Sequence, residues 1–107
     1  MNEFLELCRE VSSKAEYLPL PSERQPHYQR VLDYITVHPE QRVAIAELFC
    51  RCVLGMQEPS PASIYLIRFS MRALKWPEVR VAAQKAYDNE VNGMYAGELK
   101  SLLAIYE

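Results

Sequence analysis

Cysteine and histidine are the side chains best suited to metal binding or nucleophilic chemistry, and their spacing argues against both. The chain has three cysteines and two histidines. Cys50 and Cys52 fall within one predicted helix, where residues two apart point about 200° away from each other and cannot chelate one ion. Cys8, His27 and His38 complete no recognised metal-ligand spacing with them. We therefore expect free, mostly buried thiols, no bound metal and a reducing compartment.

The acidic side chains form no catalytic pattern. The sequence contains no glycine-rich phosphate loop, no G-x-S-x-G motif and no H-E-x-x-H motif. Asp33 and Asp88 are isolated on predicted helix surfaces, and Glu58 and Glu98 stand near predicted loops without supporting residues. We predict that the protein is not an enzyme and binds no cofactor.

Three basic residues at helical spacing form the best polar candidate for a binding surface. Arg68, Arg72 and Lys75 are separated by four and three positions, which places them on one line of a predicted helix. Tyr65 and Trp76 flank this line. Such a stripe could receive an acidic protein surface, or phosphates with bases stacked on the aromatic rings. The alternative is a solvated helix face, partly neutralised by glutamates of the adjoining helix.

Aromatic residues supply the second candidate surface. The chain has seven tyrosines and one tryptophan, residue types that anchor interfaces because they join a large apolar area to a polar tip. Met94 and Tyr95 lie in a predicted loop that would present both side chains. Core packing is the alternative for each aromatic residue. The predicted partner-binding residues are Tyr65, Arg68, Arg72, Lys75, Trp76, Met94 and Tyr95.

Six helices are predicted to position these side chains. Apolar residues recur at intervals of three and four, as in Phe4, Cys8 and Val11, which is typical of one-sided helices. Proline begins several helices and glycine ends them. We place the start of the second helix at Pro26, although Ser22–Gln25 resembles a capping box. The predicted helices span residues 3–17, 26–37, 39–54, 61–75, 77–91 and 97–106.

An internal repeat organises these helices. Segment 39–56 returns as segment 77–94, an offset of 77 − 39 = 38 residues. Eight of the eighteen positions are identical: Pro, Glu, Arg, Val, Ala, Val, Gly and Met. A sequence segment that recurs at an interval of about 20–50 residues is typical of stacked helical repeats.

The repeated block Pro-Glu-x-Arg-Val-Ala resembles the second helix of a HEAT repeat, and the resemblance covers two helix pairs. In HEAT repeats the arginine typically reaches an aspartate near the end of the preceding helix. Arg42 and Arg80 match that arginine, whereas Thr36 and Leu74 stand in place of the aspartate. The resemblance implies an all-α, HEAT-like right-handed array, or α-solenoid, of five to six helices that serves protein scaffolding or recognition. An irregular helical bundle is the alternative fold.

The distribution of apolar residues predicts which helices lie inside the array. Apolar side chains surround most of helices 39–54 and 61–75, whereas helices 3–17 and 77–91 are one-sided. We therefore expect the two former helices at the centre. The last helix is apolar on most of its surface and must cover a core edge or pair with another subunit, so a homodimer is one alternative.

Length, composition and charge set the class of molecule. Half of the 107 residues are apolar and only three are glycine, which suits one helical domain spanning residues 1–107. A net charge of −2 gives no strong general attraction to nucleic acid or anionic lipid. No run approaches the roughly 18 apolar residues of a membrane span, and no signal peptide is recognisable. We expect a cytoplasmic protein.

The predicted function is that of a non-enzymatic protein–protein interaction module. It would act as an adaptor, or as an immunity- or antitoxin-like inhibitor that occludes a partner enzyme. The alternative function is nucleic-acid binding through the stripe of Arg68, Arg72 and Lys75.

Overall fold

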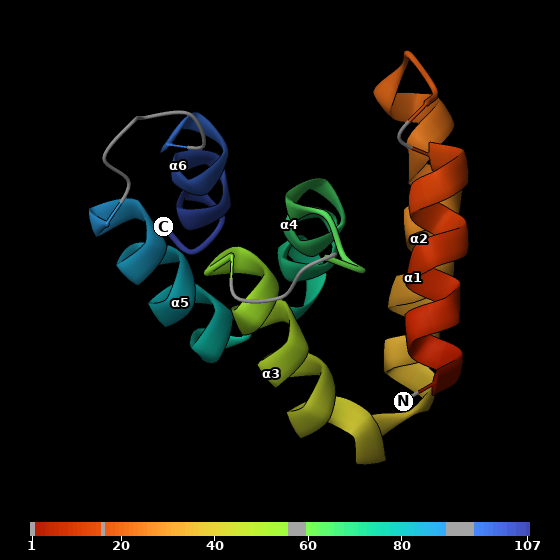
Figure 1. Ribbon diagram of the computed structural model, residues 1–107, viewed down its shortest axis with the longest axis horizontal. Helices are drawn as coiled ribbons and strands as arrows, with labels where there is room; N and C mark the ends of the chain where they lie inside the picture. Colours follow the sequence, from red (N-terminus) through yellow and green to blue (C-terminus); the bar gives the residue numbers. More distant parts are fainter. Residues whose placement is uncertain (1, 16, 56–59, 90–95) are drawn as a thin grey trace.

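A computed structural model describes residues 2–15, 17–55, 60–89 and 96–107 of the chain. All regular structure in these segments is helical, as the sequence predicts, and Figure 1 shows its course. The elements are α1 (Asn2–Ala15), α2 (Pro21–Val37), the 3₁₀ turn η1 (Pro39–Gln41), α3 (Arg42–Val53), α4 (Ile64–Leu74), α5 (Pro77–Asp88) and α6 (Ala96–Ala104).

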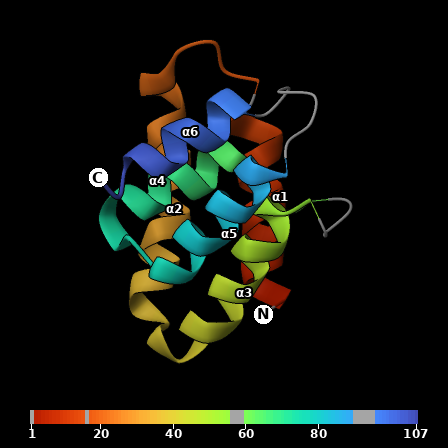
Figure 2. The ribbon, with the colours of Figure 1, turned by 90° about the vertical axis from the view of Figure 1, so that its left-hand side faces the viewer.

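The helices form two groups that share one core. α1 and α2 make an antiparallel hairpin at one side of the molecule, and the other four helices pack together beside it (Figures 1 and 2). The ring of Phe4 lies 5.9 Å from that of Phe49, which joins α1 to α3. The ring of Tyr28 lies 5.7 Å from that of Phe69, which joins α2 to α4. Because these contacts belong to one buried cluster, the described residues form one folded unit.

The two repeated helices lie side by side. α3 packs on α5, with the beginnings of both helices together. The Arg42 guanidinium donates from Nη1 to Glu78 Oε2 at 2.6 Å and from Nη2 to Glu78 Oε1 at 3.0 Å. Thr36, at the position of the HEAT aspartate, donates its hydroxyl to the carbonyl of Leu32 at 2.9 Å. The arginine of the first repeat copy therefore binds the glutamate of the second copy instead of an upstream partner.

The predicted start of the second helix was wrong. α2 begins at Pro21, and Pro26 lies inside the helix. Pro21 occupies the first helical turn, where a missing N–H is tolerated. Arg24 Nε donates to the carbonyl of Leu18 at 2.8 Å, which ties the first turn to the preceding chain. Leu20 is the N-cap residue and no side-chain hydrogen bond caps the helix, so the resemblance of Ser22–Gln25 to a capping box corresponds to no cap.

The predicted starts of the third and fourth helices also differ from the structure. Segment 39–41 is a 3₁₀ turn, and α3 begins at Arg42. α4 begins at Ile64, because the Ser63 hydroxyl accepts a hydrogen bond from the Leu66 N–H at 3.2 Å. Ser60 stands directly before Pro61, a pattern that predicts an N-cap, but its hydroxyl donates to the Ala62 carbonyl at 2.8 Å.

The start of α3 is more exposed than the sequence predicts. The buried residues of α4 are Leu66, Ile67, Ser70 and Met71, which lie on one face. At the start of α3, Val43 is 77% exposed, although it belongs to a helix that the sequence predicts at the centre. Its counterpart Val81 on α5 is 69% exposed. The expected central position is therefore wrong for the first turn of α3, whereas α4 contacts α2, α3 and α6.

A candidate binding surface on α4

The three predicted cations lie in one row along α4 and its C-cap. Arg72 and Lys75 are exposed, and Arg68 is partly buried. Arg68 Nη1 lies 3.4 Å from Glu98 Oε2 of α6, and the guanidinium lies 5.6 Å from the centre of the Tyr65 ring. Neither Arg72 nor Lys75 makes an ion pair with another described residue. The acidic neighbour of the row is therefore Glu98, not a glutamate of α3.

Lys75 ends α4 in a left-handed conformation. Its φ and ψ are 47° and 47°, a region that favours glycine, and its N–H donates to the Met71 carbonyl at 2.9 Å. This turn redirects the chain before α5 begins at Pro77. As a result the next residue, Trp76, points into the core.

Trp76 lies in the core and not on the surface beside the cations. Its side chain is 7% exposed, and its ring lies 6.1 Å from that of Phe49. The Arg42 guanidinium covers the ring at 4.3 Å from its centre, and Tyr106 Oη donates to the Trp76 carbonyl at 2.8 Å. Burial raises the pKa of Tyr106 to about 12. This cluster therefore fixes the start of α5. The other two predicted anchors, Met94 and Tyr95, lie outside the described residues.

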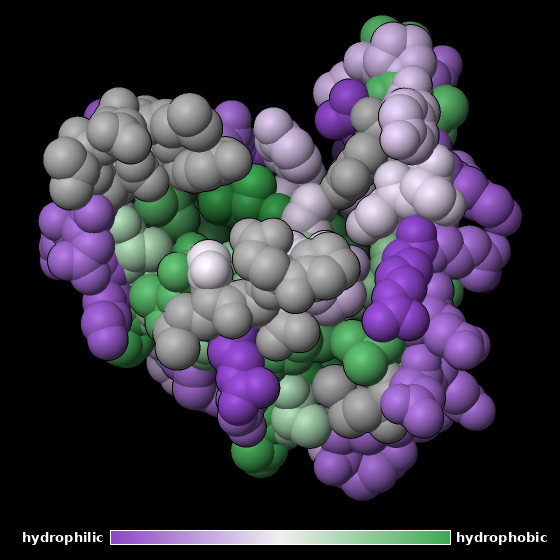
Figure 3. Space-filling view, in the orientation of Figure 1, coloured by the Kyte–Doolittle hydropathy of each residue, from purple (hydrophilic) through white to green (hydrophobic). Residues whose placement is uncertain are grey.

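A cleft of about 520 Å³ opens beside the first turn of α4. Its walls come from the end of α3, residues 60–63, the start of α4, the end of α5 and α6. The apolar lining includes Val53, Leu54, Ala62, Ile64, Tyr65 and Leu99. In Figure 3 apolar side chains line a hollow between α6, α5 and the end of α3. No charged residue belongs to the described lining. Tyr65 lines the cleft, and its ring also faces Arg68, the first residue of the cation row.

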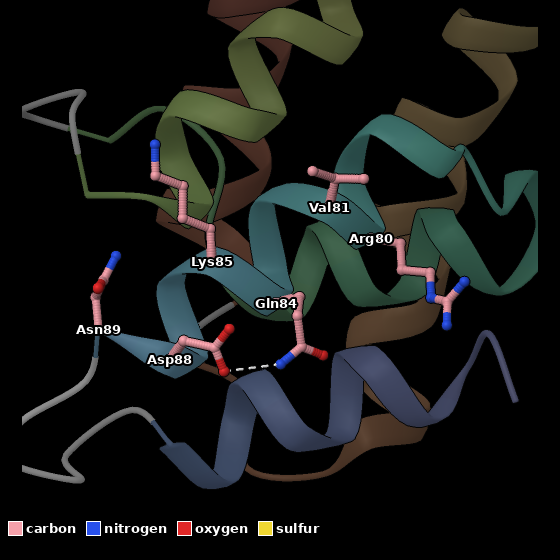
Figure 4. Close-up of a pocket in the computed structure, with 6 residues that line it drawn as sticks. All are labelled: Arg80, Val81, Gln84, Lys85, Asp88 and Asn89. Atoms are coloured by element: carbon pink, nitrogen blue, oxygen red, sulfur yellow. Dashed lines mark hydrogen bonds between the residues drawn. The ribbon is translucent and has the colours of Figure 1, made fainter.

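A second, shallower groove of about 620 Å³ runs along the outer side of α5. Figure 4 shows that all six of its residues come from α5 and its C-cap, with α3 on one side and α6 on the other. Gln84 Nε2 donates to Asp88 Oδ1 at 2.9 Å along it. Since one helix supplies the whole lining and Val81 is its one apolar residue among those described, this groove offers little apolar surface.

The thiols are free, as the sequence predicts, but only one is fully buried. Burial, with a smaller contribution from nearby Cys52, raises the pKa of Cys8 to about 12. Burial also raises the pKa of Cys50, with Glu78 and Glu47 adding to the effect. Cys50 Sγ donates to the Glu78 carbonyl at 3.4 Å. Both thiols are therefore poor nucleophiles at neutral pH. Within the described ranges no three His, Cys, Asp or Glu side chains gather closely enough to hold a metal ion.

Comparisons of the chain with models of protein families, with characterised proteins and with solved structures found no match. In the part of the chain that the structure describes, every helix is too short or too polar to cross a membrane.

Proposed function

We propose that the protein is a non-enzymatic protein-binding module and that α4 and the adjoining cleft form its recognition surface. One observation carries this proposal. Tyr65 stands at the junction of an uncharged, mostly apolar cleft and a row of cations of which Arg72 and Lys75 have no acidic partner among the described residues.

This combination suits a protein partner. Binding energy at protein interfaces is concentrated where an apolar or aromatic side chain fills a desolvated pocket. Charges at the rim contribute orientation and association rate more than affinity. The cleft supplies the first feature. Arg68 beside Tyr65, with Arg72 and Lys75 farther along α4, supplies the second. The biological role would be that of an adaptor or of an inhibitor that occludes a partner enzyme in the cytoplasm.

A HEAT-like array is the architecture we propose for this module. Two observations support it: the repeated helices α3 and α5 pack side by side with their starts together, and Arg42 of one repeat copy binds Glu78 of the next. A contact between successive repeat positions is the kind of nearest-neighbour interface that holds helical repeats together.

Nucleic-acid binding is the second candidate function, and the cation row beside the Tyr65 ring favours it. Phosphate contacts make such binding strongly salt-dependent. If the protein binds nucleic acid, we expect heparin to retain it at low salt and the variant Arg72→Glu to lose this retention. A protein that passes through the column at low salt excludes it.

The protein-binding proposal is tested by affinity capture from a lysate of the native host. The bait is the full chain, compared with Tyr65→Ala and with Arg9→Glu, an exposed charge reversal on α1, a helix that contributes no described residue to the cleft. We expect a captured protein that survives moderate salt, persists with Arg9→Glu and disappears with Tyr65→Ala. Capture that is equal for all three baits, or absent with the wild-type chain, contradicts the proposal.

A further inference from the structure

We infer that this surface selects an acidic, extended segment of a partner protein, with one apolar side chain in the cleft and carboxylates along the cation row. The inference rests on the proposed protein-binding function and names the chemistry of the partner. It follows from the charges of α4, from the spacing along the helix and from the placement of Lys75 and Glu98.

The charge along α4 has one sign. Between Ile64 and Lys75 the sequence carries Arg68, Arg72 and Lys75 and no acidic residue. Glu98 is the one carboxylate with an ion-pair contact to the row among the described residues, at a long 3.4 Å. A protein with a net charge of −2 therefore concentrates positive charge beside an apolar cleft. Electrostatic complementarity then favours a partner with negative charge next to its apolar anchor.

The spacing of the row sets the register of that partner. At about 1.5 Å of rise per residue, Arg72 lies about 10 Å from Tyr65 along the helix axis, and Lys75 about 15 Å. An extended chain advances about 3.3 Å per residue. Carboxylates about three and about four to five positions from the apolar anchor would therefore meet Arg72 and Lys75.

Lys75 keeps a positive charge where the backbone favours glycine. Its φ of 47° lies in the left-handed region. Replacement by glycine relieves this backbone strain and removes only the side chain. Lys75→Gly thus separates two properties of this residue. Loss of the backbone strain raises stability, whereas loss of the side chain lowers the affinity for the ligand.

Glu98 competes for the same cations. Its carboxylate contacts Arg68, which also lies over the Tyr65 ring at the edge of the cleft. An incoming carboxylate must share or replace this contact. Glu98→Gln therefore raises the affinity for an acidic ligand by about two- to threefold, the size of an exposed ion pair.

The test begins with a random decapeptide display library selected on the full-length protein. We expect enriched peptides to contain one aliphatic or aromatic residue with an excess of Asp and Glu three to five positions away. The same selection on the double variant Arg72→Glu with Lys75→Glu loses this acidic excess. Enrichment without the excess, or no enrichment at all on the wild-type protein, overturns the inference.

Affinities are then measured by fluorescence polarisation with the most enriched peptide. We expect about tenfold weaker binding with Arg72→Glu and about two- to fivefold weaker binding with Lys75→Gly, whereas Glu98→Gln strengthens it. Lys75→Gly is also expected to raise the midpoint of urea denaturation. Arg9→Glu on α1 is the matched control and leaves the affinity unchanged. Insensitivity to both Arg72→Glu and Lys75→Gly contradicts the inference, and circular dichroism confirms that each variant folds.

Two other occupants are outcomes of the same experiment. Tighter binding of a twenty-residue oligothymidylate than of the peptide points to nucleic acid and overturns the inference. Self-association that disappears with Tyr65→Ala shows that a second copy of this chain fills the cleft, which also overturns it. If the captured host protein is lost with Tyr65→Ala but retained with Arg72→Glu and Lys75→Gly, the protein-binding function stands and only the acidic selectivity fails.

Discussion

Two serines of the α4 segment differ in what their hydroxyl groups contact. Ser63 caps α4, whereas Ser70 is fully buried and its Oγ has no hydrogen-bond partner among the described residues. A buried hydroxyl without a partner costs about 1–3 kcal/mol, and an N-cap contributes about 1 kcal/mol. We predict that Ser70→Ala raises the free energy of unfolding by about 1 kcal/mol and that Ser63→Ala lowers it by about 1 kcal/mol.

Urea denaturation of the two variants checks this prediction. Both substitutions remove one oxygen from the same helix segment, so each serves as the control for the other. A loss of stability in Ser70→Ala contradicts the assignment, because it would mean that the buried hydroxyl forms a stabilising hydrogen bond.

The bond between Arg42 and Glu78 makes stability depend on pH. The hydrogen bonds from Arg42 lower the pKa of Glu78 below its usual value. A carboxylate whose pKa is lower in the folded state stabilises the fold above its unfolded pKa of about 4.3, and this contribution is lost as the pH falls through the folded pKa. Because the pair is partly exposed, we predict that Glu78→Gln costs about 0.5–1 kcal/mol at pH 7 and less as the pH falls from about 5 to 3.

The repeat provides a matched control for this pH dependence. Glu40 is the counterpart of Glu78 at the offset of 38 residues, and it makes no ion pair with the described residues. Glu40→Gln should therefore change the free energy of unfolding little at pH 7, because it removes no such ion pair. Urea denaturation at several pH values measures both differences. An equal cost of Glu78→Gln at pH 7 and pH 3 contradicts the assignment.

At the scale of the element, Pro26 interrupts the hydrogen bonding of α2. It lies five residues after Pro21, beyond the first turn, so the Ser22 carbonyl loses its helical partner. An interior proline costs about 3 kcal/mol in a helix and recovers up to about 1 kcal/mol by restricting the unfolded chain. We predict that Pro26→Ala raises the free energy of unfolding by about 1–2 kcal/mol.

Pro21→Ala is the control, since proline at the first helical position is tolerated and its replacement should have a small effect. Thermal and urea denaturation measure both variants. A negligible effect of Pro26→Ala contradicts the prediction and favours a helix that begins at Pro26 in solution, the start that the sequence pattern indicates.

The helices themselves were predictable, and their starts were less so. Pro77 is the one residue near the start of α5 that suits the first helical position, and the prediction there is confirmed. At two other starts the structure uses a nearby residue of the same type: α2 begins at Pro21 and not at Pro26, and Ser63, not Ser60, caps α4. Local preference is equal for such pairs, so contacts with the neighbouring chain decide between them.

The candidate site was likewise predictable only in part. The cation row follows from spacing within one helix, which the sequence displays directly. The burial of Trp76 depends on Phe49, Arg42 and Tyr106, which lie 27 to 34 positions away along the chain. The cleft likewise needs walls from α3, α4, α5 and α6. A local sequence pattern cannot reveal contacts between residues that lie so far apart along the chain.

At the scale of the whole molecule, α5 is the second of the two repeated helices, and its outer side is polar. On α3 the side that meets α5 carries Arg42, Ala46 and Cys50. A shift of 38 residues turns the last two into Gln84 and Asp88, which are exposed and bonded to each other (Figure 4). A polar face of this kind does not favour the stacking of another helix, because its polar groups would lose water. We therefore predict a monomer of 12.4 kDa, measured by size-exclusion chromatography with light scattering.

The corresponding gain-of-association variant is Gln84→Ala with Asp88→Val, which makes the outer side of α5 as apolar as the facing side of α3. We expect its molar mass to rise with concentration, since an exposed apolar helix face favours association. The control is Gln29→Ala with Asp33→Val on α2, which removes a bond of the same type, spacing and exposure at 2.8 Å. That variant should remain monomeric, because no repeat position lies beside it. A wild-type dimer, or equal association of both double variants, contradicts the interpretation of α5 as the polar end of the proposed HEAT-like array.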